Sequence, residues 1–202
     1  MKTSHPIRRP SAFTLIELLV VITIIIILAG MAFPVVTGVM EKARKVRTLA
    51  VIKDLQVAIK GYQTEYNRYP SSETGSDVET DTKKSALVPI LMGADGQAKM
   101  NGRDISFIDL PMAKNDRGGL IGQDEDSYQL VDEWSNAYQV IMDTSGDGKV
   151  KNPDTGNEDS TISSGASTQL PSGVAIYSYG PDGAPPKSKR SPSKDDITSW
   201  RS

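Results

Sequence analysis

The sequence predicts an α+β fold, in which a long N-terminal helix packs on a small antiparallel β-sheet head with a long C-terminal loop region. Residues 13–40 are predominantly apolar, and residues 41–69 repeat apolar side chains at the spacing of one helix face. After residue 70, Gly, Asp and Pro separate short runs of β-branched and aromatic residues. The first two features predict one helix with a transmembrane half and an amphipathic half, and the third predicts the sheet.

Composition excludes several functions before any motif is considered. The 202 residues include 23 Lys and Arg against 25 Asp and Glu, so the net charge of -2 gives no global signal for nucleic acid. There is no cysteine, and His5 is the only histidine. Once the N-terminal segment is removed, the chain cannot build a Ser-His-Asp triad, a Cys-His pair or a His-ligated zinc site. We therefore expect a protein that is not an enzyme.

The apolar stretch is long enough to cross a membrane. From Leu18 to Met40, 23 residues carry no formal charge. At a rise of about 1.5 Å per residue they would span about 35 Å, against about 30 Å for the apolar core of a bilayer. We expect a transmembrane helix over residues 13–40, and a buried helix of a soluble protein is the alternative.

Residues 1–12 have the features of a short leader, with three basic residues and no acidic one. The small pair Ser11-Ala12 precedes the apolar stretch, whereas in an ordinary secretory signal the small residues follow it. Cleavage there would leave the apolar helix on the mature chain. Glu17 lies near the start of that helix, where a carboxylate indicates a function unless it sits at the level of the lipid headgroups.

Residues 12–21, AFTLIELLVV, resemble the class III signal of type IV pilins and pseudopilins. The resemblance implies that a prepilin peptidase cleaves between Ala12 and Phe13, and that Phe13 becomes the N-methylated first residue. It also implies that Glu17 meets the charged N-terminus of a neighbouring subunit during assembly. Pro34 falls where the family commonly has a proline, which should kink or interrupt the helix.

Residues 41–69 are expected to continue the helix beneath a globular periplasmic head formed by residues 70–202. One apolar stripe is predicted to face the head, and it comprises Val46, Leu49, Ile52, Leu55, Ile59, Tyr62 and Tyr66. The helix should end before Pro70. The polar segment 71–84 is predicted to be a loop, and strands are expected at 105–108, 137–142 and 174–179.

Residues 143–154, DTSGDGKVKNPD, predict a calcium site by their spacing. They place oxygen ligands as in an EF-hand-type loop, with Gly148 at the sharp turn. The candidate ligands are Asp143, Ser145, Asp147, Asp154 and the carbonyl of Lys149. A β-hairpin loop with solvated carboxylates is the alternative.

A second calcium prediction comes from the resemblance. The segments 132–138, 178–183 and 195–200 resemble the C-terminal half of the major pseudopilin of type II secretion. In that family a loop of this kind holds a structural calcium ion with carboxylates and backbone carbonyls. The resemblance implies that the ligands are Asp182, Asp195 and Asp196. A capped turn with a docked Trp200 is the alternative.

The resemblance implies a structural subunit of a type II secretion pseudopilus, processed by prepilin peptidase and assembled through its N-terminal helix, with a calcium-stabilised head. Its expected partners are further copies in a helical filament, the peptidase and the assembly platform in the membrane, with no nucleic acid. Before assembly it should cross the bacterial inner membrane once, with the N-terminus cytoplasmic and the head periplasmic. A surface type IV pilin and a membrane-tethered calcium-dependent binding module that does not polymerise are the alternatives.

Overall fold

The structure, a computed structural model, describes residues 13–73, 75–94, 96, 99–156, 160–183 and 196–201, without the side chains of residues 32–37, 126, 156 and 161. The chain divides into two compact units, Met1–Lys42 and Ala43–Ser202. The expected fold class is confirmed, because a long N-terminal helix is followed by a small antiparallel sheet and loops.

Helix α1 runs without a break from Leu15 to Tyr66, a length of 52 residues. The interruption predicted at Pro34 is wrong, since residue 34 lies inside the helix. A proline removes one backbone donor, and the hydrogen bonds on either side of it can continue the helix. The helix ends as predicted before Pro70, where Asn67 takes a left-handed φ of 51°.

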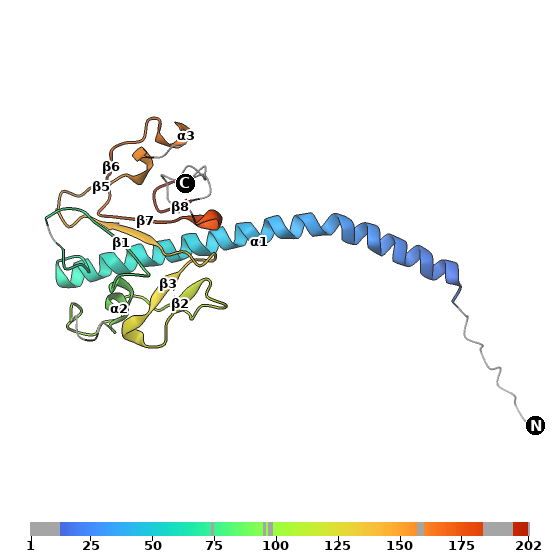
Figure 1. The fold of residues 1–202 in the computed structure, drawn as a ribbon, viewed down its shortest axis with the longest axis horizontal. Helices are drawn as coiled ribbons and strands as arrows, with labels where there is room; N and C mark the ends of the chain where they lie inside the picture. Colours follow the sequence, from blue (N-terminus) through green and yellow to red (C-terminus); the bar gives the residue numbers. More distant parts are fainter. Residues whose placement is uncertain are drawn as a thin grey trace, which may run out of the picture. The chain divides into compact units, whose positions relative to one another are not determined.

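The head is organised by a four-stranded antiparallel sheet in the order β1-β4-β7-β8 (Figure 1). Its strands are Val78–Asp81, Gln139–Met142, Val174–Ser178 and Ile197–Thr198. Two smaller ladders pair β2, Gly119–Ile121, with β3, Gln129–Val131, and β5, Val150–Lys151, with β6, Gln169–Leu170. Short helical segments complete the head: α2 (Leu87–Met92), η1 (Glu125–Ser127), η2 (Pro153–Gly156), α3 (Ser160–Ser163) and η3 (Gly180–Asp182).

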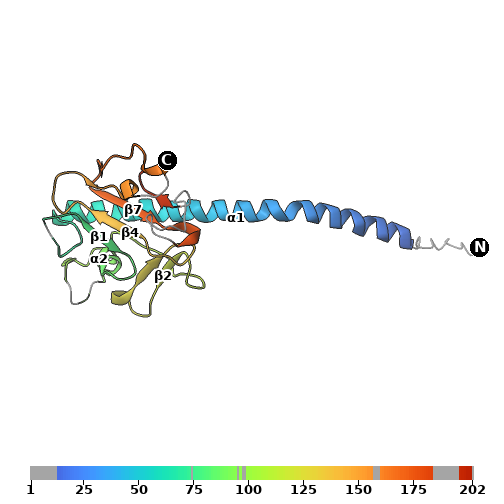
Figure 2. The same cartoon turned by 45° about the horizontal axis from the view of Figure 1, so that its top comes forward.

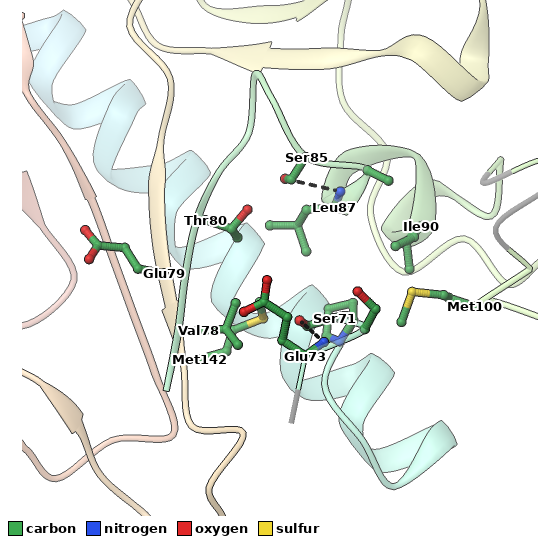
Figure 3. Close-up of a pocket in the computed structure, with 13 residues that line it drawn as sticks. Ser71, Glu73, Val78, Glu79, Thr80, Ser85, Leu87, Ile90, Met100 and Met142 are labelled. Atoms are coloured by element: carbon green, nitrogen blue, oxygen red, sulfur yellow. Dashed lines mark hydrogen bonds between the residues drawn. The ribbon is translucent and has the colours of Figure 1, made fainter. Parts of the chain in front are cut away.

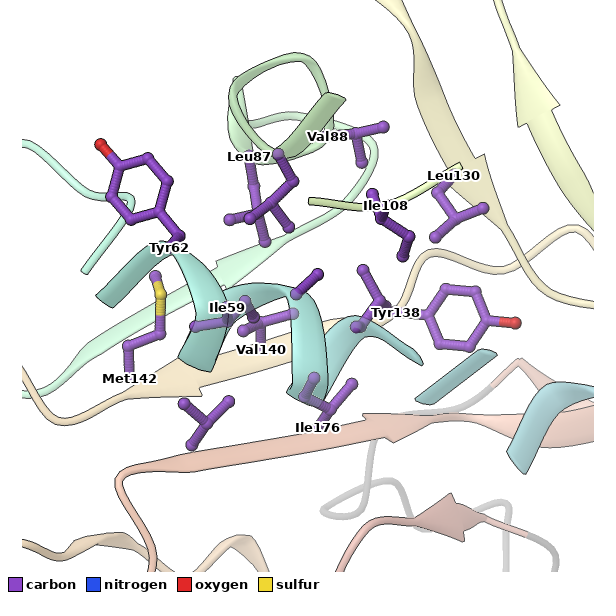
Figure 4. Close-up of a cluster of buried hydrophobic side chains, with 14 of the residues drawn as sticks. Ile59, Tyr62, Leu87, Val88, Ile108, Leu130, Tyr138, Val140, Met142 and Ile176 are labelled. Atoms are coloured by element: carbon purple, nitrogen blue, oxygen red, sulfur yellow. The ribbon is translucent and has the colours of Figure 1, made fainter. Parts of the chain in front are cut away.

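The core of the head forms where the second half of α1 lies along the sheet, as both views of the ribbon show (Figures 1 and 2). Ile59 and Tyr62 of α1 share one buried cluster with Val140 of β4 and Ile176 of β7 (Figure 4). On the other side of the helix the same cluster includes Leu87 and Val88 of α2, together with Ile108 and Leu130. Apolar burial on both sides therefore holds this half of α1 in the head.

The predicted apolar stripe enters the core only in part. Ile52, Leu55, Ile59 and Tyr62 are fully buried, and Tyr66 is partly buried against them. The prediction is wrong for Val46 and Leu49, which are 67% and 37% exposed. Periodicity identifies the apolar face of a helix, but it does not show how far the partner layer extends along it.

Two further predictions about the head are wrong. The segment 71–84 is not only loop, because it contains β1, whose residues pair with β4 from Val78 to Asp81. The segment 105–108 is not a strand. The Asn101 side chain donates to the Ile105 carbonyl at 2.7 Å and accepts its amide at 3.1 Å, and the Phe107 amide donates to Leu91 at 2.8 Å. These contacts take the backbone groups that a strand would need.

Candidate functional site

The start of α1 is closed by reciprocal hydrogen bonds between Thr14 and Glu17. The Thr14 hydroxyl accepts the Glu17 amide at 3.2 Å, and Glu17 Oε2 accepts the Thr14 amide at 2.8 Å. This arrangement is a capping box, which satisfies two of the free donors at a helix start. Phe13 precedes the helix and is 77% exposed, whereas Ala12 lies outside the described residues. The carboxylate of the apolar segment therefore has a structural partner within its own chain.

The first half of α1 exposes an extensive apolar surface. The large apolar side chains exposed between residues 15 and 31 are Leu15, Ile16, Leu18, Leu19, Val20, Val21, Ile22, Ile24, Ile25, Ile26, Ile27, Leu28 and Met31. Soluble monomers rarely expose a continuous surface of this kind, which normally contacts lipid or another protein. Among the residues that the structure describes, no helix is both long and apolar enough to cross a membrane. For Pro34 only the backbone is described.

Asp143 organises the loop that follows β4. Its carboxylate accepts hydrogen bonds at 2.6–3.2 Å from four donors, the Ser145 hydroxyl and the amides of Gly146, Asp147 and Gly148. Desolvation alone would raise the pKa of Asp143, but these hydrogen bonds outweigh it and hold the pKa below its ordinary value of 3.8. The loop thus brings Asp143, Ser145 and Asp147 together, and Asp147 also accepts the Lys149 amide at 2.9 Å.

The carboxylate of Asp154 binds residues outside the loop 143–154. Its carboxylate pairs with the Arg201 guanidinium at two points, one of them Nε to Oδ2 at 3.0 Å, and accepts the Trp200 indole N–H at 2.8 Å. The Trp200 ring packs edge-on against Tyr177 of β7, with ring centroids 5.8 Å apart. Asp154 therefore fastens the segment 196–201 to η2, and the docked tryptophan considered from sequence is present.

The C-terminal candidate ligands stand at the two ends of the segment that joins η3 to β8. Asp182 ends η3 and is exposed, whereas Asp196 directly precedes β8 and is buried. Asp195 lies outside the described residues. Within the described ranges, no three His, Cys, Asp or Glu side chains converge as metal ligands. Calcium binding thus stays a prediction.

The turn that carries Asp182 is held by a buried polar network. Asp132 is fully buried and accepts the Ser178 hydroxyl and the amides of Trp134 and Asn136. The Asn136 side-chain amide donates to the Gly180 carbonyl at 2.7 Å. Desolvation raises the pKa of Asp132, although these hydrogen bonds act in the opposite direction. This role of Asp132 was not predicted from the sequence, where the residue is one of two adjacent carboxylates directly after a strand.

A cavity of about 210 Å³ lies between residues 70–73, β1 and α2 (Figure 3). Val78, Leu87 and Met142 form its apolar wall. At its edge the Ser71 hydroxyl accepts the Glu73 amide at 3.1 Å. No predicted site residue lines this cavity, so it is separate from the acidic loops.

Comparison with known proteins identifies the N-terminal segment most clearly. Residues 7–33 match the prokaryotic N-terminal methylation motif. The chain is 39% identical to the type II secretion system core protein G of Aeromonas hydrophila over 82 residues, which are 41% of this chain and 57% of that protein. It is 40% identical to the protein of the same name from Pectobacterium carotovorum subsp. carotovorum over 67 residues, or 33% of this chain and 43% of that protein.

These two matches span about half the length of each relative. A third, to the type II secretion system core protein G of Klebsiella pneumoniae, covers 96% of both chains at 27% identity. No solved structure matches the chain. The comparisons confirm the resemblance to prepilins and to the pseudopilins of type II secretion.

Proposed function

We propose that this chain is a pseudopilin, a structural subunit that assembles through its N-terminal helix into the pseudopilus of a type II secretion system. The observation that carries the proposal is the methylation motif at residues 7–33, which overlaps the exposed apolar half of α1. That helix continues into a packed head whose sequence is similar to core protein G over most of the chain. The role is structural rather than catalytic.

In this proposal a prepilin peptidase removes residues 1–12 and Phe13 is then N-methylated. Phe13 is exposed and precedes the first helical residue, Leu15, which suits a bond that an enzyme must reach. The new N-terminus would lie one residue before Thr14, whose amide is bound to Glu17. Glu17 could then exchange this local partner for the charged N-terminus of a neighbouring copy.

Before assembly the subunit would be stored in the inner membrane, with the leader cytoplasmic and the head periplasmic. The exposed apolar side chains of residues 15–31 support this, because lipid would cover them in the stored state and neighbouring helices would cover them in the filament. Further copies, the peptidase and the membrane assembly platform would be its partners.

A calcium ion in the head belongs to the same proposal. The loop 143–154 does not fit a complete 12-residue site in this arrangement, because Asp154 is bound to Arg201. The proposal therefore places the ion at Asp182, Asp195 and Asp196 together with backbone carbonyls, as the resemblance to the major pseudopilin implies. Calcium held there would tie the segment between η3 and β8 to the sheet and stiffen the head.

Deletion of the gene in the native bacterium tests the proposal. Loss of type II substrates from the medium, restored by the wild-type chain, is the expected result. Normal secretion with loss of long surface fibres would instead support a type IV surface pilin, which would carry the same N-terminal motif.

A further inference from the structure

A cationic surface lies where the head begins. The segment 42–53 contains five Lys and Arg and no Asp or Glu, although acidic residues outnumber basic ones in the whole chain. Arg47 is 70% exposed along its side chain and approaches Glu133 only to 3.9 Å. Lys42, Arg47 and Lys53 are exposed, whereas Arg44 and Lys45 are half-buried. Cations gathered in this way attract an anionic surface.

Apolar groups are exposed among these cations. Val46 and Leu49 are the two members of the predicted stripe that stay out of the core, at 67% and 37% exposure. They line a groove of about 410 Å³ together with Ile162 and Ile197, and its polar lining is Lys45, Asp196, Thr198 and Arg201. Since Asp154 binds Arg201, Lys45 is the cation best placed to serve a ligand in the groove.

We propose that Lys45 and this groove, within the cationic segment 42–53, bind an anionic phospholipid of the membrane that anchors the chain. Lys45 would meet the phosphate and part of an acyl chain would cover Val46 and Leu49, while Arg44 and Arg47, on other faces of α1, would attract the anionic surface at longer range. The combination of cationic and apolar groups matches an amphiphile better than a free anion. The inference rests on the proposed anchoring of residues 13–40.

Position along the chain supports a lipid partner. The cationic segment begins two residues after Met40, the last of 23 uncharged residues, so anchoring would bring it to the level of the lipid headgroups. Cations on the exported side of a membrane oppose the positive-inside preference. Contact with anionic lipid gives them a favourable role there.

The test uses the full chain in vesicles. Because the chain has no cysteine of its own, a single introduced cysteine is the one site that a maleimide can label. A Leu49→Cys variant is labelled with a membrane-impermeant maleimide in phosphatidylcholine vesicles, with or without about 30% phosphatidylglycerol. Phosphatidylglycerol is expected to slow labelling several-fold, and about 0.5 M NaCl should restore the rate. A Val57→Cys variant, exposed further along α1, should not respond.

Charge removal provides the matched control. In the Leu49→Cys background, Arg44→Gln, Lys45→Gln and Arg47→Gln together should abolish the effect of phosphatidylglycerol. Lys60→Gln, Lys84→Gln and Lys114→Gln remove three charges from other exposed positions and should preserve it.

Equal labelling rates in both vesicles, with the chain retained after alkaline extraction, would overturn the inference and leave the proposed anchoring intact. If the labelling rate falls with the density of protein in the vesicles and not with lipid composition, the inference is overturned as well. That result would assign the groove to a second copy of the chain. Loss of the chain on alkaline extraction would overturn both the inference and the anchoring.

Discussion

The carboxylate of Asp154 and the guanidinium of Arg201 form a two-point ion pair that joins η2 to the segment 196–201. The two side chains are only 9% and 26% exposed, and the residues lie 47 positions apart in sequence. This pair gives Asp154 a structural partner where the spacing of its loop predicted a metal ligand.

Replacement of Asp154 by Asn should lower the free energy of unfolding of the full chain in detergent by about 1–3 kcal/mol, because Arg201 and the Trp200 indole lose a charged acceptor. Arg103→Gln, which breaks the more exposed pair with Glu65, is the control and should cost no more than about 1 kcal/mol. Urea unfolding measures both. Unchanged stability combined with weaker calcium binding in Asp154→Asn would instead identify the carboxylate as a metal ligand.

Asp132 should make the folded chain less stable as pH rises, which is opposite to the usual effect of a carboxylate. Burial raises its folded-state pKa above the ordinary value of 3.8, so the folded chain holds this proton to a higher pH than the unfolded chain does. The stabilising contribution of Asp132 is complete below the unfolded pKa and is lost as pH rises through the folded pKa. Asp132→Asn should therefore become less destabilising as pH rises above the ordinary value of 3.8, measured by urea unfolding across a pH series that extends to either side of that value.

Asp143→Asn is the control for the pH series. The pKa of Asp143 is lowered, so its contribution is present above 3.8 and is lost as pH falls through the folded pKa. The cost of Asp143→Asn should shrink toward acid pH, opposite to the trend for Asp132→Asn. Parallel trends for the two variants would contradict the assigned environments.

Glu17→Gln separates the charge of this residue from its capping role. Glutamine can still accept the Thr14 amide, so α1 should form and the leader should be cleaved. Loss of the charge-assisted contact between copies should reduce assembled filaments about tenfold or more, scored by immunoblot of chemically cross-linked copies. Thr14→Ala keeps the charge and should reduce filaments less. Wild-type filament yield from Glu17→Gln would argue against a role of the charge in assembly.

Calcium should stabilise the wild-type head through Asp182. At a calcium concentration about 100 times its Kd, the free energy of unfolding should rise by about 2.7 kcal/mol. Asp182→Asn should remove this increment, while Asp143→Asn should lower stability equally with and without calcium. Loss of the increment in Asp143→Asn alone would place the ion in the loop 143–154.

Local patterns in the sequence predicted those elements that form because of their own residues. The apolar period identified the buried residues from Ile52 to Tyr62, and β-branched runs identified β4 and β7. The polar segment VETD became a strand only because β4 pairs with it, and such a partner is not visible in a local pattern.

In the candidate site, too, contacts with neighbours in sequence could be predicted and contacts with remote residues could not. The turn chemistry of Asp143 is local, since all four of its donors lie within five residues. The partner of Asp154 is remote, so spacing within residues 143–154 could not reveal it. Asp132 likewise binds Ser178, 46 residues away, and its role emerges only when the strands are placed.

Intact-mass and N-terminal peptide analysis of the protein from its native membrane tests the central claim most directly. The pseudopilin proposal predicts a chain that lacks residues 1–12 and begins with an N-methylated Phe13. A chain that keeps its leader, in a cell whose other prepilins are processed, would contradict the proposal.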